Sequence, residues 1–154
     1  MDNRMFRDAM GKFATGITIV SAEYKDQIHG MTVNAFMSVS LDPKLIAVSI
    51  DEKASMYREL QEINGFGVSV LSDNQQDVSM VYAKQKEKDR EILFERLNGV
   101  PVVQGSLVKL ACEIHETAKA GDHMIFIAEV KDVQLNDGEP IVYYGGKYRN
   151  LEQT

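Results

Sequence analysis

The C-terminal third of the chain carries the pattern that most restricts its fold. Residues 108–115 alternate between apolar and polar side chains. Successive side chains of a strand point to opposite faces, so this alternation predicts a strand with one buried face. A turn at 118–122 and a long strand from 123 to about 135 follow. A second turn at 136–138 precedes a last strand at 141–144. This third of the chain is therefore predicted to be antiparallel β-structure.

Shorter strands are predicted in the first half of the chain. Runs of β-branched and apolar residues mark strands at 17–22, 29–33, 45–50 and 66–71. The polar turn at 25–27 joins the first two strands into a hairpin. Most of these strands follow one another directly, without a long helical crossover between them.

Three helices are predicted from apolar residues at helical spacing. The first begins after Asp2 or Asn3 and carries an apolar stripe that includes Phe6 and Phe13. The second covers 53–63, and the third begins after Ser72 or Asp73. The weakly patterned stretch 84–105 is expected to mix short helix with loop.

These elements predict a mainly β fold. Directly connected strands exclude a doubly wound α/β fold and favour an antiparallel barrel or sandwich with peripheral helices. The chain has 154 residues. Domains usually hold roughly 100–200 residues, so we expect a single domain spanning 1–154. A core of this size has a modest stability margin, which makes burial against a second subunit plausible.

Composition excludes several classes of function. Seventeen basic and twenty-three acidic residues give a net charge of −6, and no basic stripe is present, so nucleic-acid binding is not expected. No apolar run approaches the roughly 20 residues of a membrane span. The single cysteine, Cys112, excludes an intrachain disulfide. With no secretory signal in the charged N-terminal segment, the sequence predicts a cytoplasmic protein.

Generic catalytic motifs are absent, and the few reactive side chains have ordinary interpretations. A dinucleotide-binding glycine motif, a Walker A loop and a serine nucleophile elbow are all missing. Cys112 alternates with apolar residues, so we interpret it as a buried structural thiol rather than a nucleophile activated by His115. His115 and His123 flank the predicted 118–122 turn. They remain open either as cross-strand metal ligands or as surface histidines.

Two polar segments are compatible with ligand binding. Residues 31–40 end a strand and continue into small, hydroxyl-bearing and amide residues, which suit a planar polar ring and a phosphorylated tail. The same residues also suit a loop that satisfies itself through local bonds. Residues 121–123 suit an ordinary hairpin turn equally well. Physical reasoning alone leaves both segments ambiguous.

Three motifs, in this order and spacing, resemble the flavin reductase-like family. They are Gly-Lys-Phe-Ala-Thr-Gly at 11–16, Gly-Met-Thr-Val-Asn-Ala-Phe-Met-Ser-Val-Ser-Leu at 30–41, and Gly-Asp-His at 121–123. The resemblance runs from Met5 to about Tyr148. It implies an antiparallel Greek-key split β-barrel that binds FMN or FAD. Members are often the small reductase of two-component aromatic monooxygenases.

The resemblance also implies roles for individual residues. His123 would act in catalysis by positioning the nicotinamide. Val33 stands where the family commonly has alanine and would narrow the flavin pocket slightly. Residues matching the flavin-binding positions are Met31, Thr32, Val33, Asn34, Ala35, Ser49, Ile50, Lys53, Ala54 and Ser55. Lys53 and the start of the following helix would hold the flavin phosphate. Residues matching the nicotinamide contacts are Gly121, Asp122, His123 and Tyr144.

The implied activity is hydride transfer from NADH or NADPH to FMN or FAD, which needs little acid–base machinery from the protein. A homodimer and a larger partner monooxygenase are expected with it. The main alternative is a flavin-binding electron-transfer or sensor protein without nicotinamide turnover. A split-barrel oxidase acting on a phosphorylated vitamin is a further alternative, but the sequence lacks the basic cluster that it requires.

Overall fold

The structure is a computed structural model that describes residues 1–152, so the last two residues of the expected domain lie outside the described residues. Its centre is a seven-stranded sheet with the order β2-β1-β5-β8-β9-β4-β3, in which every neighbouring pair is antiparallel. Its strands are β1 Thr18–Tyr24, β2 Gln27–Val33, β3 Phe36–Leu41, β4 Lys44–Asp51, β5 Gly65–Val70, β8 Val108–Ala120 and β9 His123–Leu135.

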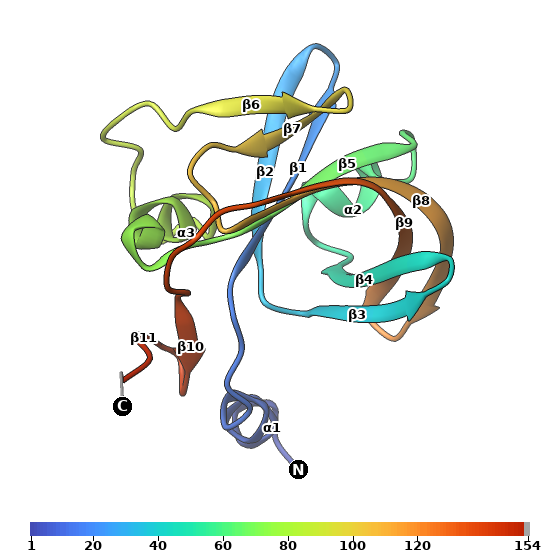
Figure 1. The fold of residues 1–154 in the computed structure, drawn as a ribbon. Helices are drawn as coiled ribbons and strands as arrows, with labels where there is room; N and C mark the ends of the chain where they lie inside the picture. The colour runs from blue at the N-terminus through green and yellow to red at the C-terminus, as the bar shows by residue number, and fades with distance from the viewer. Residues whose placement is uncertain (153–154) are drawn as a thin grey trace.

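Two small hairpins and a few short helices surround this sheet (Figure 1). The hairpins are β6 Phe94–Leu97 with β7 Val100–Val103, and β10 Val142–Tyr144 with β11 Lys147–Arg149. The helices are α1 Asn3–Gly11, α2 Ser55–Glu59 and α3 Gln76–Tyr82, with a single 3₁₀ turn, η1 Asp73–Gln75, leading into α3.

The long β8–β9 hairpin gives the sheet its curvature. Its pairing slips twice, between Ala111 and Cys112 and between Ile114 and Glu116. Such bulges bend a strand and increase its twist. In Figure 1 both strands curve round one side of the molecule toward β4. The main hydrophobic core lies inside this curve and includes the fully buried Phe66 and Phe126.

A second apolar cluster lies on the other side of β1. It joins Ile17 and Ile19 to Val78 of α3 and to Val103 of β7. The Ser72 side chain and the side chain of Gln75 form a capping box that starts η1 and α3. The predicted third helix, with its cap at Ser72, is therefore confirmed.

The predicted helix over 53–63 is wrong in length, since α2 covers only Ser55–Glu59. Lys53 and Ala54 form a turn in which the Ala54 N–H donates to the Asp51 carbonyl at 3.0 Å. Met56 and Leu60 are buried, as helical spacing predicts. Ile63 also packs on the core, but from irregular chain beyond the helix. Apolar residues at helical spacing therefore identify buried positions, but they do not show whether each position belongs to the helix or to the loop after it.

Three further expectations differ from the structure. The stretch 84–105 contains the β6–β7 hairpin rather than a short helix. Its turn is Asn98-Gly99, with both φ values positive, and this pair is a strong hairpin signal. Residues 36–41 form β3 rather than a polar loop. The strand predicted at 141–144 is not the last, because a hairpin turn at Gly145-Gly146 leads from it into β11. Within residues 1–152, every helix is too short to cross a bilayer.

Candidate functional site

Three segments that are far apart in the sequence meet at the C-terminal end of β4. The Ser49 N–H donates to the Ala35 carbonyl at 3.0 Å, which joins the end of β4 to the β2–β3 connection. Asp51 pairs with His123 across the β4–β9 ladder. The Glu52 N–H donates to the Asp122 carbonyl at 2.9 Å. Most of the predicted site residues therefore lie along one end of the sheet.

The turn before α2 presents the Lys53 ammonium group beside the first N–H groups of the helix. The Lys53 N–H donates to Asp51 Oδ1 at 2.9 Å, and the Lys53 side chain is exposed. Ala54 is the N-cap of α2 and has no side-chain oxygen to bond the first N–H groups. An anion placed here would meet both the ammonium group and these donors. With five residues, α2 adds only a small dipole.

Several side chains that were expected to contact the flavin make contacts within the protein instead. The Thr32 hydroxyl donates to the Ser79 carbonyl at 2.7 Å, and Val33 lies in the main core with 4% of its surface exposed. Ile50 is completely buried. Thr32 and Val33 at the end of β2, and Ile50 near the end of β4, therefore have backbone rather than side chains to offer a ligand. The expectation that Val33 narrows the site does not follow, because its side chain points into the core.

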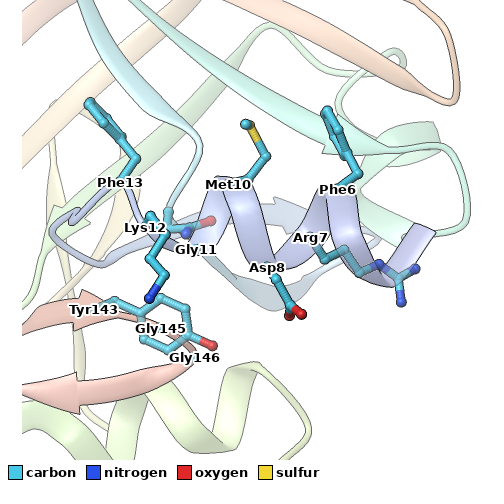
Figure 2. Close-up of a pocket in the computed structure, with 11 residues that line it drawn as sticks. Phe6, Arg7, Asp8, Met10, Gly11, Lys12, Phe13, Tyr143, Gly145 and Gly146 are labelled. Atoms are coloured by element: carbon cyan, nitrogen blue, oxygen red, sulfur yellow. The ribbon is translucent and has the colours of Figure 1, made fainter. Parts of the chain in front are cut away.

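Asn34 lies where several hollows meet. The largest, about 620 Å³, separates α1 from the β10–β11 turn. Two smaller hollows of about 220 and 170 Å³ also include Asn34 in their walls. In Figure 2, Phe6 and Met10 project from one side of α1, while Lys12 lies beside the Tyr143–Gly146 strand and turn. Phe13 was expected on the helix but projects from the segment after it, because α1 ends at Gly11. The exposed amide of Asn34 is therefore the predicted flavin residue with the most free space around it.

His123 lies at the tip of the β8–β9 hairpin. Its Nδ1 is 2.8 Å from Asp122 Oδ1, and this hydrogen bond holds the pKa of the Asp122 carboxyl below its usual value. A fixed Nδ1 orients the ring and leaves Nε2 free for another partner. His123 is about one-third exposed, with 38% of its side-chain surface open.

Sequence reasoning missed a cluster that fastens this hairpin to the turn after β4. Lys119 Nζ donates to Glu52 Oε2 at 2.7 Å and to the Tyr57 hydroxyl at 3.3 Å. The hydrogen bond to Glu52 raises the pKa of Lys119 above its ordinary value. Lys119 and Glu52 are 67 positions apart, so no local pattern could have predicted the contact.

Tyr144 lies in a different part of the surface from His123. Lys12 Nζ is 5.8 Å from its ring centroid, and Arg149 Cζ is 5.2 Å from it on β11. The neighbouring Gly145 N–H donates to the Gly11 carbonyl at 2.9 Å. These contacts tie Tyr144 to α1, whereas those of His123 lead to β4. Tyr144 and His123, both expected at the nicotinamide, are therefore held by different elements.

The structure distinguishes between the roles considered for His115, His123 and Cys112. His123 pairs with Ala120, and His115 lies in the bulge between Ile114 and Glu116, so the two histidines are not cross-strand neighbours. Residues 1–152 contain no cluster of three potential metal ligands. Cys112 is 2% exposed, and burial raises the pKa of its thiol to about 12. Its interpretation as a structural thiol is confirmed.

A flavin reductase like domain model matches residues 10–152. The chain belongs to the flavin reductase-like family. It is 42% identical to an NADH-dependent flavin reductase of a Rhodococcus species, with 95% of this chain and 85% of that protein covered. It is 35% identical to the reductase component of 4-hydroxyphenylacetate 3-monooxygenase from Thermus thermophilus, with 95% of each covered.

The solved structure of the flavin reductase PheA2 has the same fold as this family member. The two superpose with a TM-score of 0.97 at 46% identity, over 99% of this chain and all of the other. The predicted mainly β split barrel and the predicted family are therefore both confirmed.

Proposed function

We propose that the protein is an NADH-dependent flavin reductase, an oxidoreductase that uses FMN or FAD. Family membership supports the activity, and the convergence at the end of β4 is the structural observation that carries it. A cation with unbonded helix N–H groups, an exposed amide and an oriented imidazole come together there. When bound at these groups, the flavin would supply the hydride-accepting atom.

Each predicted residue has a specific task in this proposal. Backbone at Met31–Val33, together with Asn34 and Ala35, borders the flavin ring. Ser49 and Ile50 border the ring from β4 through their backbone. Lys53 supplies a positive charge to the flavin phosphate, and Ser55 supplies a backbone N–H donor to it. The N–H of Ala54 donates to the Asp51 carbonyl, so Ala54 contributes by shaping the turn.

The nicotinamide would approach from the side of the β8–β9 turn. His123 orients its carboxamide through Nε2, while Asp122 keeps the imidazole in place and Gly121 permits the tight turn with its positive φ. Tyr144 lies beside Lys12 and Arg149, and these two cations suit the phosphates of a nucleotide. We assign Tyr144 to the far end of the nicotinamide cofactor, because its contacts lead to α1.

The test mixes purified protein with NADH or NADPH and with FMN or FAD, and follows the loss of nicotinamide absorbance. We expect flavin-dependent NADH oxidation. A protein that binds flavin tightly but oxidises neither nucleotide would instead be the electron-transfer or sensor protein considered above.

Assembly and partner follow from the same proposal. We expect a homodimer, because Met5, Phe6 and Met10 of α1, and Phe13 just beyond its end, are 50–79% exposed. We also expect a larger flavin-dependent monooxygenase to use the reduced flavin, as the name of the Thermus relative indicates for that protein. We propose a single domain over 1–154 and a cytoplasmic location, where the free thiol of Cys112 would stay reduced.

A further inference from the structure

A buried carboxylate at the end of α2 has no role in the proposed reaction. The Glu59 side chain is 2% exposed, and its Oε1 lies 2.5 Å from His29 Nδ1 on β2. Its second oxygen, Oε2, is buried without a hydrogen-bond partner in the described residues. When Glu59 is ionised, its carboxylate only accepts hydrogen bonds, and His29 Nδ1 is then the donor.

Burial of this carboxylate is costly, so the contact with His29 must be maintained. A carboxylate removed from water is tolerated only when it is paired and hydrogen-bonded. His29 is partly exposed, with 36% of its side-chain surface open, and reaches inward to meet Glu59. The pair therefore fastens the last residue of α2 to the middle of β2.

Besides this pair, α2 is held by core packing and by the hydrogen bond from Lys119 to Tyr57, and the pair lies close to the proposed phosphate turn. Met56 and Leu60 pack its inner face on the core. The Tyr24 hydroxyl donates to Glu62 Oε2 at 2.9 Å just beyond the helix. Glu59 is four residues from Ser55, which is about one helical turn. A shift of Glu59 would therefore move the backbone of 53–55.

We propose that His29 and Glu59 are positioning residues that hold the Lys53–Ser55 turn in the orientation that binds the flavin phosphate. The inference rests on the proposed function, because it takes the phosphate site from it. Neither residue touches the flavin in this arrangement. We expect their effect to be largest at the phosphate, because the ring-bordering backbone of Met31–Val33 is held independently by its pairing with β1.

The test compares FMN with riboflavin, which has the same ring and no phosphate. Dissociation constants are measured by flavin fluorescence titration for the wild type, His29→Ala and Glu59→Leu. His29→Ala leaves a buried carboxylate unpaired, so Glu59→Leu is included because it removes that charge and keeps a buried apolar side chain. Circular dichroism and melting curves show that each variant is folded.

We expect both variants to raise the FMN dissociation constant roughly tenfold, about the effect of one hydrogen bond to a charged group. Riboflavin binding should change less than about twofold on the same scale. His29→Asn, whose amide N–H replaces Nδ1, should restore FMN affinity. Arg58→Ala is the matched control, because Arg58 lies on the same helix in an exposed pair with Glu62 at 3.8 Å.

Equal weakening of both flavins, or no weakening, would overturn the positioning role. The variant Lys53→Ala tests the phosphate assignment separately from the positioning role of His29 and Glu59. If it also affects FMN and riboflavin equally, the phosphate assignment is wrong and the inference fails with it. If the wild type binds FMN but does not oxidise NADH, the reductase activity is refuted while the FMN-specific effect of His29 still stands.

Discussion

Gly67 on β5 is a residue whose identity the packing dictates. A Cβ atom there would lie 2.0 Å from the Pro101 carbonyl oxygen, because β7 crosses the sheet at this point. The Ser21 hydroxyl donates to the same carbonyl at 2.6 Å, and Ser69 Oγ accepts from the Val103 N–H at 2.9 Å. Small and hydroxyl-bearing residues on β1 and β5 thus let a second strand lie directly on the sheet.

Gly67→Ala should destabilise the protein by about 1–3 kcal/mol, because a methyl group forced into a packed backbone contact displaces β7. Gly16→Ala is the control, since a Cβ there meets nothing within 4 Å. Urea unfolding of both variants measures the difference. Equal unfolding midpoints would show that β7 moves away at no cost.

His123→Ala should lower the rate of NADH oxidation while flavin binding is retained. The imidazole lies at the β8–β9 turn, about a strand width from β4, and the flavin segment does not depend on it. A loss of roughly tenfold to a hundredfold is expected for a residue that orients a reactant. Steady-state kinetics and a flavin titration of the same preparation give both quantities. Unchanged kinetics would remove His123 from the site.

At the scale of elements, the β6–β7 hairpin depends on its two-residue turn. Asn98 and Gly99 have φ values of 48° and 86°, which match the twist of the strands that they join. The hairpin packs through Val102 and Leu97 against Ala111 of β8. Local turn chemistry and tertiary packing therefore act together in a segment whose apolar periodicity is weak.

Gly99→Ala should cost about 1 kcal/mol, because a residue with a Cβ is strained at this φ. Asn98→Gly keeps the turn accessible and is expected to change stability by less than about 0.5 kcal/mol. Thermal unfolding of the two variants beside the wild type checks this. The hypothesis is contradicted if Asn98→Gly is the more damaging change.

At the scale of the whole molecule, the proposed site is exposed to solvent in a single subunit. Lys53 and His123 lie on surface turns, and the large hollow beside Asn34 is walled on one side by α1. The apolar stripe of α1 is exposed next to that hollow. A second subunit packed on α1 would cover the stripe and close the hollow.

The double variant Phe6→Ser and Phe13→Ser should therefore convert a dimer into a monomer, because it removes two large apolar side chains from the stripe. Sedimentation velocity at micromolar concentration measures the oligomeric state. Asp8→Asn is the matched control on α1, since in Figure 2 Asp8 projects away from Phe6. A monomeric wild type would refute the expected homodimer.

The sequence by itself determined the strand-rich class, the β8–β9 hairpin, the capped α3 and, through the order of its motifs, the family. These depend on side-chain period, turn residues and local caps, which act over a few neighbouring positions. The tertiary structure alone decided which segments meet at the end of β4. It also ruled out a pair between His115 and His123, buried the side chains of Val33 and Ile50, and joined Lys119 to Glu52. Those outcomes depend on strand register and bulges, because one residue of slip turns a side chain to the other face of the sheet.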